Sequence, residues 1–165
     1  GSPHGAYEQQ FSLEHIEKQV AELRKQAEAN PGDVATNVKL ANSLFNVASM
    51  QKRRGSADGG QQQWNEAISF YGKALKQEDS PDVRCDMATC YFELGKVAES
   101  IREFKEVVAK HPEHSNAAFN LGVVLAASGD KSGAAKIWED LARKQPQSDA
   151  GKLAGMNLKR LNEGK

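Results

Sequence analysis

The sequence repeats itself at a distance of 34 residues, and this period constrains the fold more than any other feature. When the segment from Pro81 is aligned with the segment from Ser115, small residues fall on small ones and large apolar residues on large apolar ones. The aligned pairs are Ala88 with Gly122, Tyr91 with Leu125, Gly95 with Gly129, Ser100 with Ala134, Phe104 with Trp138, Val107 with Leu141 and Pro112 with Pro146. A period of roughly 20–50 residues indicates an array of structural repeats.

Each repeat is predicted to form two helices. Residues 82–94 place apolar side chains at helical spacing, and Gly95 provides a C-terminal stop. Residues 97–110 carry a second apolar stripe, which ends before Pro112. The next repeat follows the same plan, so the unit is a helix pair.

Small and large residues at fixed positions predict how these helices pack. Ala88 and Gly122 are small, which indicates positions where two helices approach closely. Phe104 and Trp138 are predicted to be core residues that fill the space between one helix pair and the next.

This pattern resembles the tetratricopeptide repeat family, and in particular its bacterial three-repeat proteins. The family unit carries a large residue, a large–small pair, an aromatic residue or Leu, Gly, a small residue, an aromatic residue, Ala and Pro. One copy is Met87-Ala88, Tyr91, Gly95, Ser100, Phe104, Val107 and Pro112, and the next is Leu121-Gly122, Leu125, Gly129, Ala134, Trp138, Leu141 and Pro146. Arg84 and Ala118 depart from the pattern at the first large position. The resemblance implies an all-α fold, an α-solenoid in which antiparallel helix pairs stack into a right-handed superhelix.

An earlier repeat matches the pattern but contains an insertion. Leu40-Ala41 and Leu44 match the first helix, whereas Ala67, Tyr71, Ala74 and Leu75 match the second. Fourteen extra residues lie within about 49–63. We expect a first helix lengthened to about Arg54, a mobile Gly-rich loop over 55–60 that contributes nothing to the core, and a second helix that starts early.

The predicted organisation is one repeat domain over residues 8–162, with about three repeats between two capping helices. Residues 1–7 are interpreted as a tag or disordered lead, and capping helices shield the ends of stacked repeats. The predicted segments are an N-terminal helix over 8–30, repeat 1 over 33–79, repeat 2 over 81–113, repeat 3 over 115–147 and a capping helix over 149–162.

Charge and apolar content disfavour several classes of partner. Lys plus Arg number 22 and Asp plus Glu also number 22, so the formal net charge is zero and no global field attracts nucleic acid. No apolar run approaches the ~20 residues of a membrane helix, so we expect no membrane contact from this segment and no intact secretory signal.

The two cysteines indicate neither a disulfide nor a metal site. Cys85 and Cys90 would lie roughly 140° apart around one helix, too divergent for a mutual bridge. Free thiols favour a reducing compartment and hence the cytoplasm, and the alternative is the soluble periplasmic part of a membrane-anchored protein.

Residues that could carry catalysis are scarce. His111 and His114 flank the turn at Pro112, but two ligands without a third make a poor metal site, and we expect no cofactor. No phosphate-binding glycine loop occurs, and no His is placed beside Cys90 to activate it. We therefore predict that the protein is not an enzyme. The one basic cluster, residues 52–54, is either a solvated helix end or a contact for phosphate, an acidic peptide or lipid headgroups.

The family resemblance implies that the first helix of each pair lines a concave groove. Asn offers a donor and an acceptor to a peptide backbone, and Phe offers apolar contact area. The candidate groove residues are Val38, Asn42, Phe45, Asn46, Asp86, Thr89, Phe92, Asn116, Phe119, Asn120 and Val123. We expect at least one of the three Phe residues to belong to the core instead.

One known use of such a groove is disfavoured. Family members that bind chaperone tails hold a C-terminal carboxylate with two Lys, two Asn and an Arg. The matching positions here are Val38, Asn42, Asp86, Asn116 and Asn120, of which only Asn42 is kept. Asp86, with no Lys or Arg beside it, would repel a carboxylate.

The sequence thus favours a non-catalytic module that binds a protein or peptide ligand, as a scaffold or assembly factor. The alternative is structural self-association through the end helices or the convex face. We expect a monomer or a weak homodimer.

Overall fold

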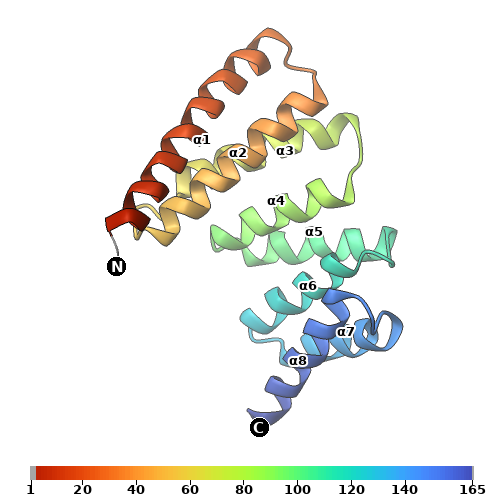
Figure 1. Ribbon diagram of the computed structural model, residues 1–165. Helices are drawn as coiled ribbons and strands as arrows, with labels where there is room; N and C mark the ends of the chain where they lie inside the picture. The colour runs from red at the N-terminus through yellow and green to blue at the C-terminus, as the bar shows by residue number, and fades with distance from the viewer. Residues whose placement is uncertain (1–2, 165) are drawn as a thin grey trace. The chain divides into compact units, whose positions relative to one another are not determined.

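The computed structural model describes residues 3–164, with side chains from Leu13 onward. The described residues form eight α-helices packed as sequential antiparallel pairs, as predicted (Figure 1). The helices are α1 (Pro3–Ala29), α2 (Val34–Arg53), α3 (Gln61–Gln77), α4 (Pro81–Glu93), α5 (Val97–Lys110), α6 (Ser115–Ala127), α7 (Lys131–Lys144) and α8 (Asp149–Glu163). None of them combines the length and the apolar character that a membrane span requires.

The chain divides into two compact units, Gly1–Val83 and Arg84–Lys165. The first contains α1, α2, α3 and the start of α4, and the second contains the rest of α4 and the helices after it. The all-α repeat array is confirmed. The right-handed superhelix and the single continuous domain stay predictions.

Helix boundaries agree with the sequence to within one or two residues except at the N-terminus. The helix predicted from Glu8 begins at Pro3, so it includes residues 3–7 of the segment interpreted as a tag or disordered lead. Gly1 and Ser2 lie outside the described residues. The C-terminal helix runs to Glu163, one residue beyond the predicted end.

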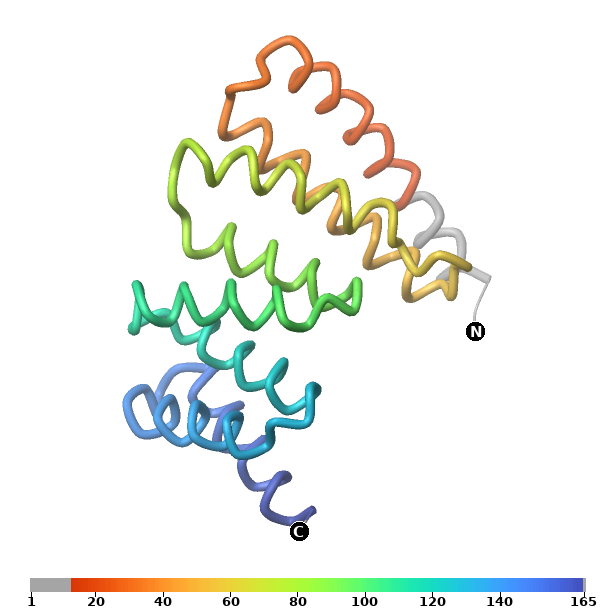
Figure 2. Tube along the Cα trace, turned by 180° about the vertical axis from the view of Figure 1, so that it is seen from behind, coloured from red at the N-terminus to blue at the C-terminus, as the bar shows by residue number. Residues whose placement is uncertain are grey.

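The core of the first unit lies between consecutive helices. Buried side chains recur at helical spacing along α2 and α3, which lie side by side in both views (Figures 1 and 2). The buried set is Leu40, Ala41, Leu44, Val47 and Ala48 on α2 with Trp64, Ala67, Tyr71 and Ala74 on α3. Val20 and Ala27 of α1 are also buried.

The insertion forms the predicted long helix, glycine turn and early second helix, but the turn is not a passive loop. Asp58 Oδ1 accepts hydrogen bonds from the Gly60 amide and the Ser56 hydroxyl, both at 3.0 Å. Trp64 Nε1 donates to the carbonyl oxygen of Gly59 at 3.2 Å. Gly60 itself is buried, and a Cβ there would lie 2.6 Å from the carbonyl oxygen of Ala48. The expectation that residues 55–60 contribute nothing to packing is therefore wrong, because this turn docks onto α2.

In the second unit, one buried cluster joins α4, α5, α6, α7 and α8. Phe104 and Trp138 are both buried in it, which confirms them as core residues. The predicted role of Trp138 between successive pairs stays a prediction, because its indole lies against Gly122 of its own pair and donates from Nε1 to the Phe119 carbonyl at 3.1 Å. Ser100, fully buried, donates from Oγ to the Ala88 carbonyl at 2.8 Å.

Candidate binding surface

Helix α6 of the second unit has one face in the core and one face toward solvent. Ala117, Leu121 and Val124 are buried, whereas the candidate residues occupy the opposite side. Asn116 is exposed, and Phe119, Asn120 and Val123 are half-buried. The two asparagine side chains form no hydrogen bond with any other described residue.

Phe119 contributes to the core as well as to this face. Its ring stacks on Trp138 with the ring centroids 6.1 Å apart and an interplanar angle of 29°. Phe92, on α4, also packs against the buried cluster while remaining half-buried. Each of these two aromatic side chains is thus held in place with part of its surface accessible. The expectation that at least one of the three Phe residues belongs to the core instead stays a prediction.

The two polar candidates on α4, Thr89 and Asp86, already interact with other residues of the protein. Thr89 donates from Oγ1 to the Cys85 carbonyl of its own helix at 3.1 Å. Asp86 is half-buried, and after burial its negative charge and that of Glu93 help to raise the pKa of the Cys90 thiol.

The candidate residues on α2 lie in the first unit, and some of their polar atoms and apolar surface are already used within the protein rather than open to a ligand. Asn42 Oδ1 accepts a hydrogen bond from the Tyr71 hydroxyl at 2.6 Å, so its carbonyl oxygen is already used. Phe45 packs edge-on against Trp64 with centroids 5.0 Å apart. Val38 is half-buried, and Asn46 is exposed. A shallow hollow of about 440 Å³ lies beside Asn42, between α1 and α2.

Two histidines lie at the turn between α5 and α6. His114 is the N-cap of α6, and its Nδ1 accepts a hydrogen bond from the Ala117 amide at 3.1 Å. His111 Nδ1 lies 3.7 Å from the Glu113 carboxylate. Within residues 3–164, no group of three or more His, Cys, Asp or Glu side chains is arranged to hold a metal ion.

Neither cysteine has the environment of a nucleophile. Cys85 and Cys90 are free thiols, and both are buried. Burial raises the pKa of the Cys90 thiol, and the carboxylates of Asp86 and Glu93 raise it further. Because the thiolate is the reactive form, the raised pKa disfavours reaction at Cys90 at neutral pH.

The basic cluster lies where a helix end favours cations. Lys52 and Arg53 are in the last turn of α2, and Arg54 is its C-cap. Positive side chains there interact favourably with the helix dipole, which agrees with a solvated helix end, and the contact for an anionic group stays a prediction.

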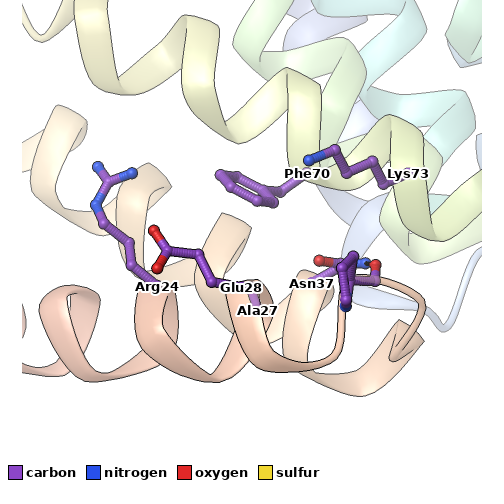
Figure 3. Close-up of a pocket in the computed structure, with 7 residues that line it drawn as sticks. Arg24, Ala27, Glu28, Asn37, Phe70 and Lys73 are labelled. Carbon is purple, nitrogen blue, oxygen red and sulfur yellow. Dashed lines mark hydrogen bonds between the residues drawn. The ribbon is translucent and has the colours of Figure 1, made fainter.

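A cavity in the first unit was not predicted from the sequence. It measures about 280 Å³ and lies among α1, α2 and α3 (Figure 3). The lining residues are Arg24, Ala27, Glu28, Pro31, Asn37, Phe70 and Lys73, none of which is a candidate groove residue. The only sequence signal was Asn37, a polar residue at a position where the repeat pattern calls for a large one.

A family model matches part of the chain. Residues 85–150 match a tetratricopeptide repeat model, and these residues run from α4 to the start of α8. This part of the chain consists of tetratricopeptide repeats. Such repeats are in general protein–protein interaction modules and are typically non-catalytic.

Several solved structures share this fold. MamA is 18% identical, with a TM-score of 0.67 over 88% of this chain and 81% of its own. The Sgt2 TPR domain from Aspergillus fumigatus is 24% identical, with a TM-score of 0.54 over 70% of this chain and 79% of its own. A Podosopora anserina putative kinesin light chain with nearly identical TPR-like repeats is 17% identical, with a TM-score of 0.67 over 96% and 80%. These identities establish likeness of fold alone. No curated protein sequence matches the chain.

Proposed function

We propose that this tetratricopeptide repeat protein is a non-catalytic scaffold or assembly factor that binds a peptide segment or helix of a partner protein. In the second unit, the binding surface comprises the solvent-facing sides of α4 and α6, the first helices of its repeats. The part best suited to bind a peptide is the face of α6 that carries Asn116, Phe119, Asn120 and Val123.

The observation that carries this proposal is the combination of free amides and anchored apolar surface on α6. Asn116 and Asn120 lie on one side of the helix, and neither side-chain amide bonds to another described residue. Between them, Phe119 is fixed by its stacking on Trp138. An extended peptide needs donors and acceptors for its backbone and apolar contact for its side chains, and this face offers both.

A selected peptide ligand gives the most direct test. A peptide is first isolated from a random display library against the wild-type protein, and its affinity is measured by calorimetry. The double variant Asn116→Ala with Asn120→Ala is expected to lose about 1–3 kcal/mol of binding free energy, because ligand groups are left unpaired. Its melting temperature should stay near that of the wild type, since neither amide bonds to another described residue.

Asn162→Ala is the matched control, because it removes an exposed amide from α8 rather than α6. This variant should bind the peptide as the wild type does. An unchanged affinity in the folded double variant would remove the α6 face from the proposal and favour self-association.

Self-association is the second candidate function, and two exposed apolar side chains on the last helix favour it. Leu153 and Met156 are 45% and 52% exposed and lie three residues apart on α8. Light scattering over a hundredfold range of concentration tests this candidate. A mass that stays monomeric throughout rejects it, whereas a dimer that Leu153→Glu dissociates supports it.

A further inference from the structure

The turn after α1 is hydrogen-bonded like the turns that follow α5 and α7. In each turn, one backbone amide bonds to the carbonyl oxygen four residues earlier, and a second amide bonds to the carbonyl oxygen of that first residue, three residues back. The bonds run from Asn30 to Gln26 and from Asp33 to Asn30, from His111 to Val107 and from His114 to His111, and from Gln145 to Leu141 and from Ser148 to Gln145. Residue 30 therefore corresponds to residues 111 and 145, so α1 occupies the place of the second helix of a repeat.

α8 corresponds to the first helix of a repeat, and its open face is the one that a second helix would cover. Leu153 follows Phe119 of α6 by one period of 34 residues. Met156 follows Gly122 by the same distance. In α6 both positions contact the second helix α7, because the Phe119 ring stacks on Trp138 and the same indole lies against Gly122. In α8, however, Leu153 and Met156 are 45% and 52% exposed.

α1 has the matching open face, beside a hollow that it shares with α2. Leu23 corresponds to Phe104 and Trp138, which are buried, whereas Leu23 is only half-buried. With Gln19 and Glu22 it lines the hollow of about 440 Å³ between α1 and α2. In the second unit, the first helix α6 packs against both its own second helix, α7, and the next first helix, α8. The hollow lies at the corresponding place for α1 and α2, so a first helix would fill it.

The charges on the two open faces match an ion pair that the chain already forms within one repeat. Arg84 Nη1 on α4 lies 2.8 Å from Glu103 Oε2 on α5, and thus joins a first helix to its second helix. Lys152 lies two periods after Arg84, and Glu22 of α1 holds the position of that α5 carboxylate. The side chains of Lys152 and Glu22 form no ion pair or hydrogen bond with another residue that the structure describes. A second carboxylate of α5 lies 3.4 Å from the same guanidinium nitrogen, but Lys25 holds its position in α1, so we expect one ion pair rather than two.

We propose that α8 of one copy of this protein packs against α1 and α2 of a second copy, as the first helix that completes their repeat. In this contact Leu153 and Met156 cover Leu23 in the hollow. The Lys152 ammonium meets the Glu22 carboxylate. A second α8 is not the occupant, since it is itself a first helix and offers neither the hollow nor this carboxylate. The inference rests on self-association, the second candidate function, and names the two surfaces that meet.

The two surfaces differ, so this contact is heterologous. Each copy has one face at α1 and α2 and another at α8, and it can therefore bind a neighbour through each. Heterologous contacts of this kind produce rings or open chains of subunits rather than two-fold dimers. The average mass of the protein should therefore rise with concentration beyond that of a dimer.

Charge reversal tests the contact, and both exchanges are made at exposed positions. Lys152→Glu and Glu22→Lys each place like charges opposite each other, so each variant should associate about tenfold more weakly than the wild type or worse. An equimolar mixture of the two variants places opposite charges at every mixed contact and should recover the average mass of the wild type at the same total concentration. Sedimentation equilibrium from micromolar to millimolar protein measures these masses. Glu17→Lys is the matched control, because Glu17 is an exposed acid of α1 that does not line the hollow, and it should associate as the wild type does.

The possible results separate this contact from self-association in general. If the wild type associates but either reversal leaves its association unchanged, the contact is wrong, although self-association through another surface stands. If both reversals weaken association and their mixture does not recover it, the pairing of Lys152 with Glu22 is wrong. A wild type that stays monomeric up to millimolar concentration would overturn both this inference and the second candidate function. Peptide binding to α6 is measured separately, so its failure would leave this contact untouched.

Discussion

Gly122 shows how a single residue sets the distance between two helices. The indole of Trp138 lies so close to its Cα that a Cβ on residue 122 would come within 2.1 Å of Nε1. The same indole nitrogen bonds to the Phe119 carbonyl, so the ring cannot retreat without losing that bond. Gly122→Ala should therefore lower the free energy of unfolding by about 1–3 kcal/mol, measured by denaturant titration.

Gly155→Ala is the control for this prediction, since it makes the same change in a helix where no atom lies within 4 Å of the added Cβ. It should raise the free energy of unfolding by up to ~1 kcal/mol, because alanine loses less conformational freedom in a helix than glycine. Equal effects at the two positions would mean that Trp138 does not pack on Gly122 as described.

At this scale, the sequence identified the residues that follow the repeat period and missed those that do not. Gly122 and Trp138 could be found because both have a partner 34 residues away. The bond between Tyr71 and Asn42 could not, because it joins residues 29 positions apart in a repeat of altered length. Asn37 was missed because an orphaned buried oxygen depends on the neighbouring helices as well as on its own position.

Among the elements, the turn between α2 and α3 differs most from expectation. Its composition predicted flexibility, but three of its glycines adopt positive φ angles and one of them touches α2. The periodic helices were predictable since apolar spacing determines them, whereas a turn takes its order from specific hydrogen bonds. The same limit applies to His114, where composition alone did not reveal a helix cap.

Gly60→Ala tests the role of this turn. Gly60 has a φ of 81°, and a Cβ there would lie 2.6 Å from the Ala48 carbonyl oxygen. Alanine would be strained in this left-handed backbone conformation, and its Cβ would crowd α2. Together these effects should lower the free energy of unfolding by about 2–4 kcal/mol, measured by thermal or denaturant unfolding.

Gly59→Ala separates these two effects. Gly59 also has a positive φ, of 61°, but no atom lies within 4 Å of its added Cβ. It should cost only the strain of about 1–2 kcal/mol. If Gly60→Ala costs no more than Gly59→Ala, the turn does not dock on α2 and the original expectation of a passive loop is restored.

For the whole molecule, the main consequence of the repeat is that packing contacts join helices that are close together in the sequence. Each repeat of such an array contacts its neighbours, so stability is approximately a sum of local contributions and unfolding need not be all-or-none. The chain supplies a reporter for each compact unit, because its two tryptophans are Trp64 in the first unit and Trp138 in the second.

Single-tryptophan proteins can measure this locality. Trp138→Phe leaves Trp64 as the only reporter, and Trp64→Phe leaves Trp138. When Gly60→Ala is added to each, the fluorescence midpoint in urea should fall clearly for Trp64 and much less for Trp138. The reason is that the strain lies at α2 and α3, while Trp138 packs on α6. Phe104→Leu, in the buried cluster of the second unit, should give the reverse pattern. Equal shifts at both tryptophans for both substitutions would show that the molecule unfolds as one cooperative unit, and the additive description of its repeats would then be wrong.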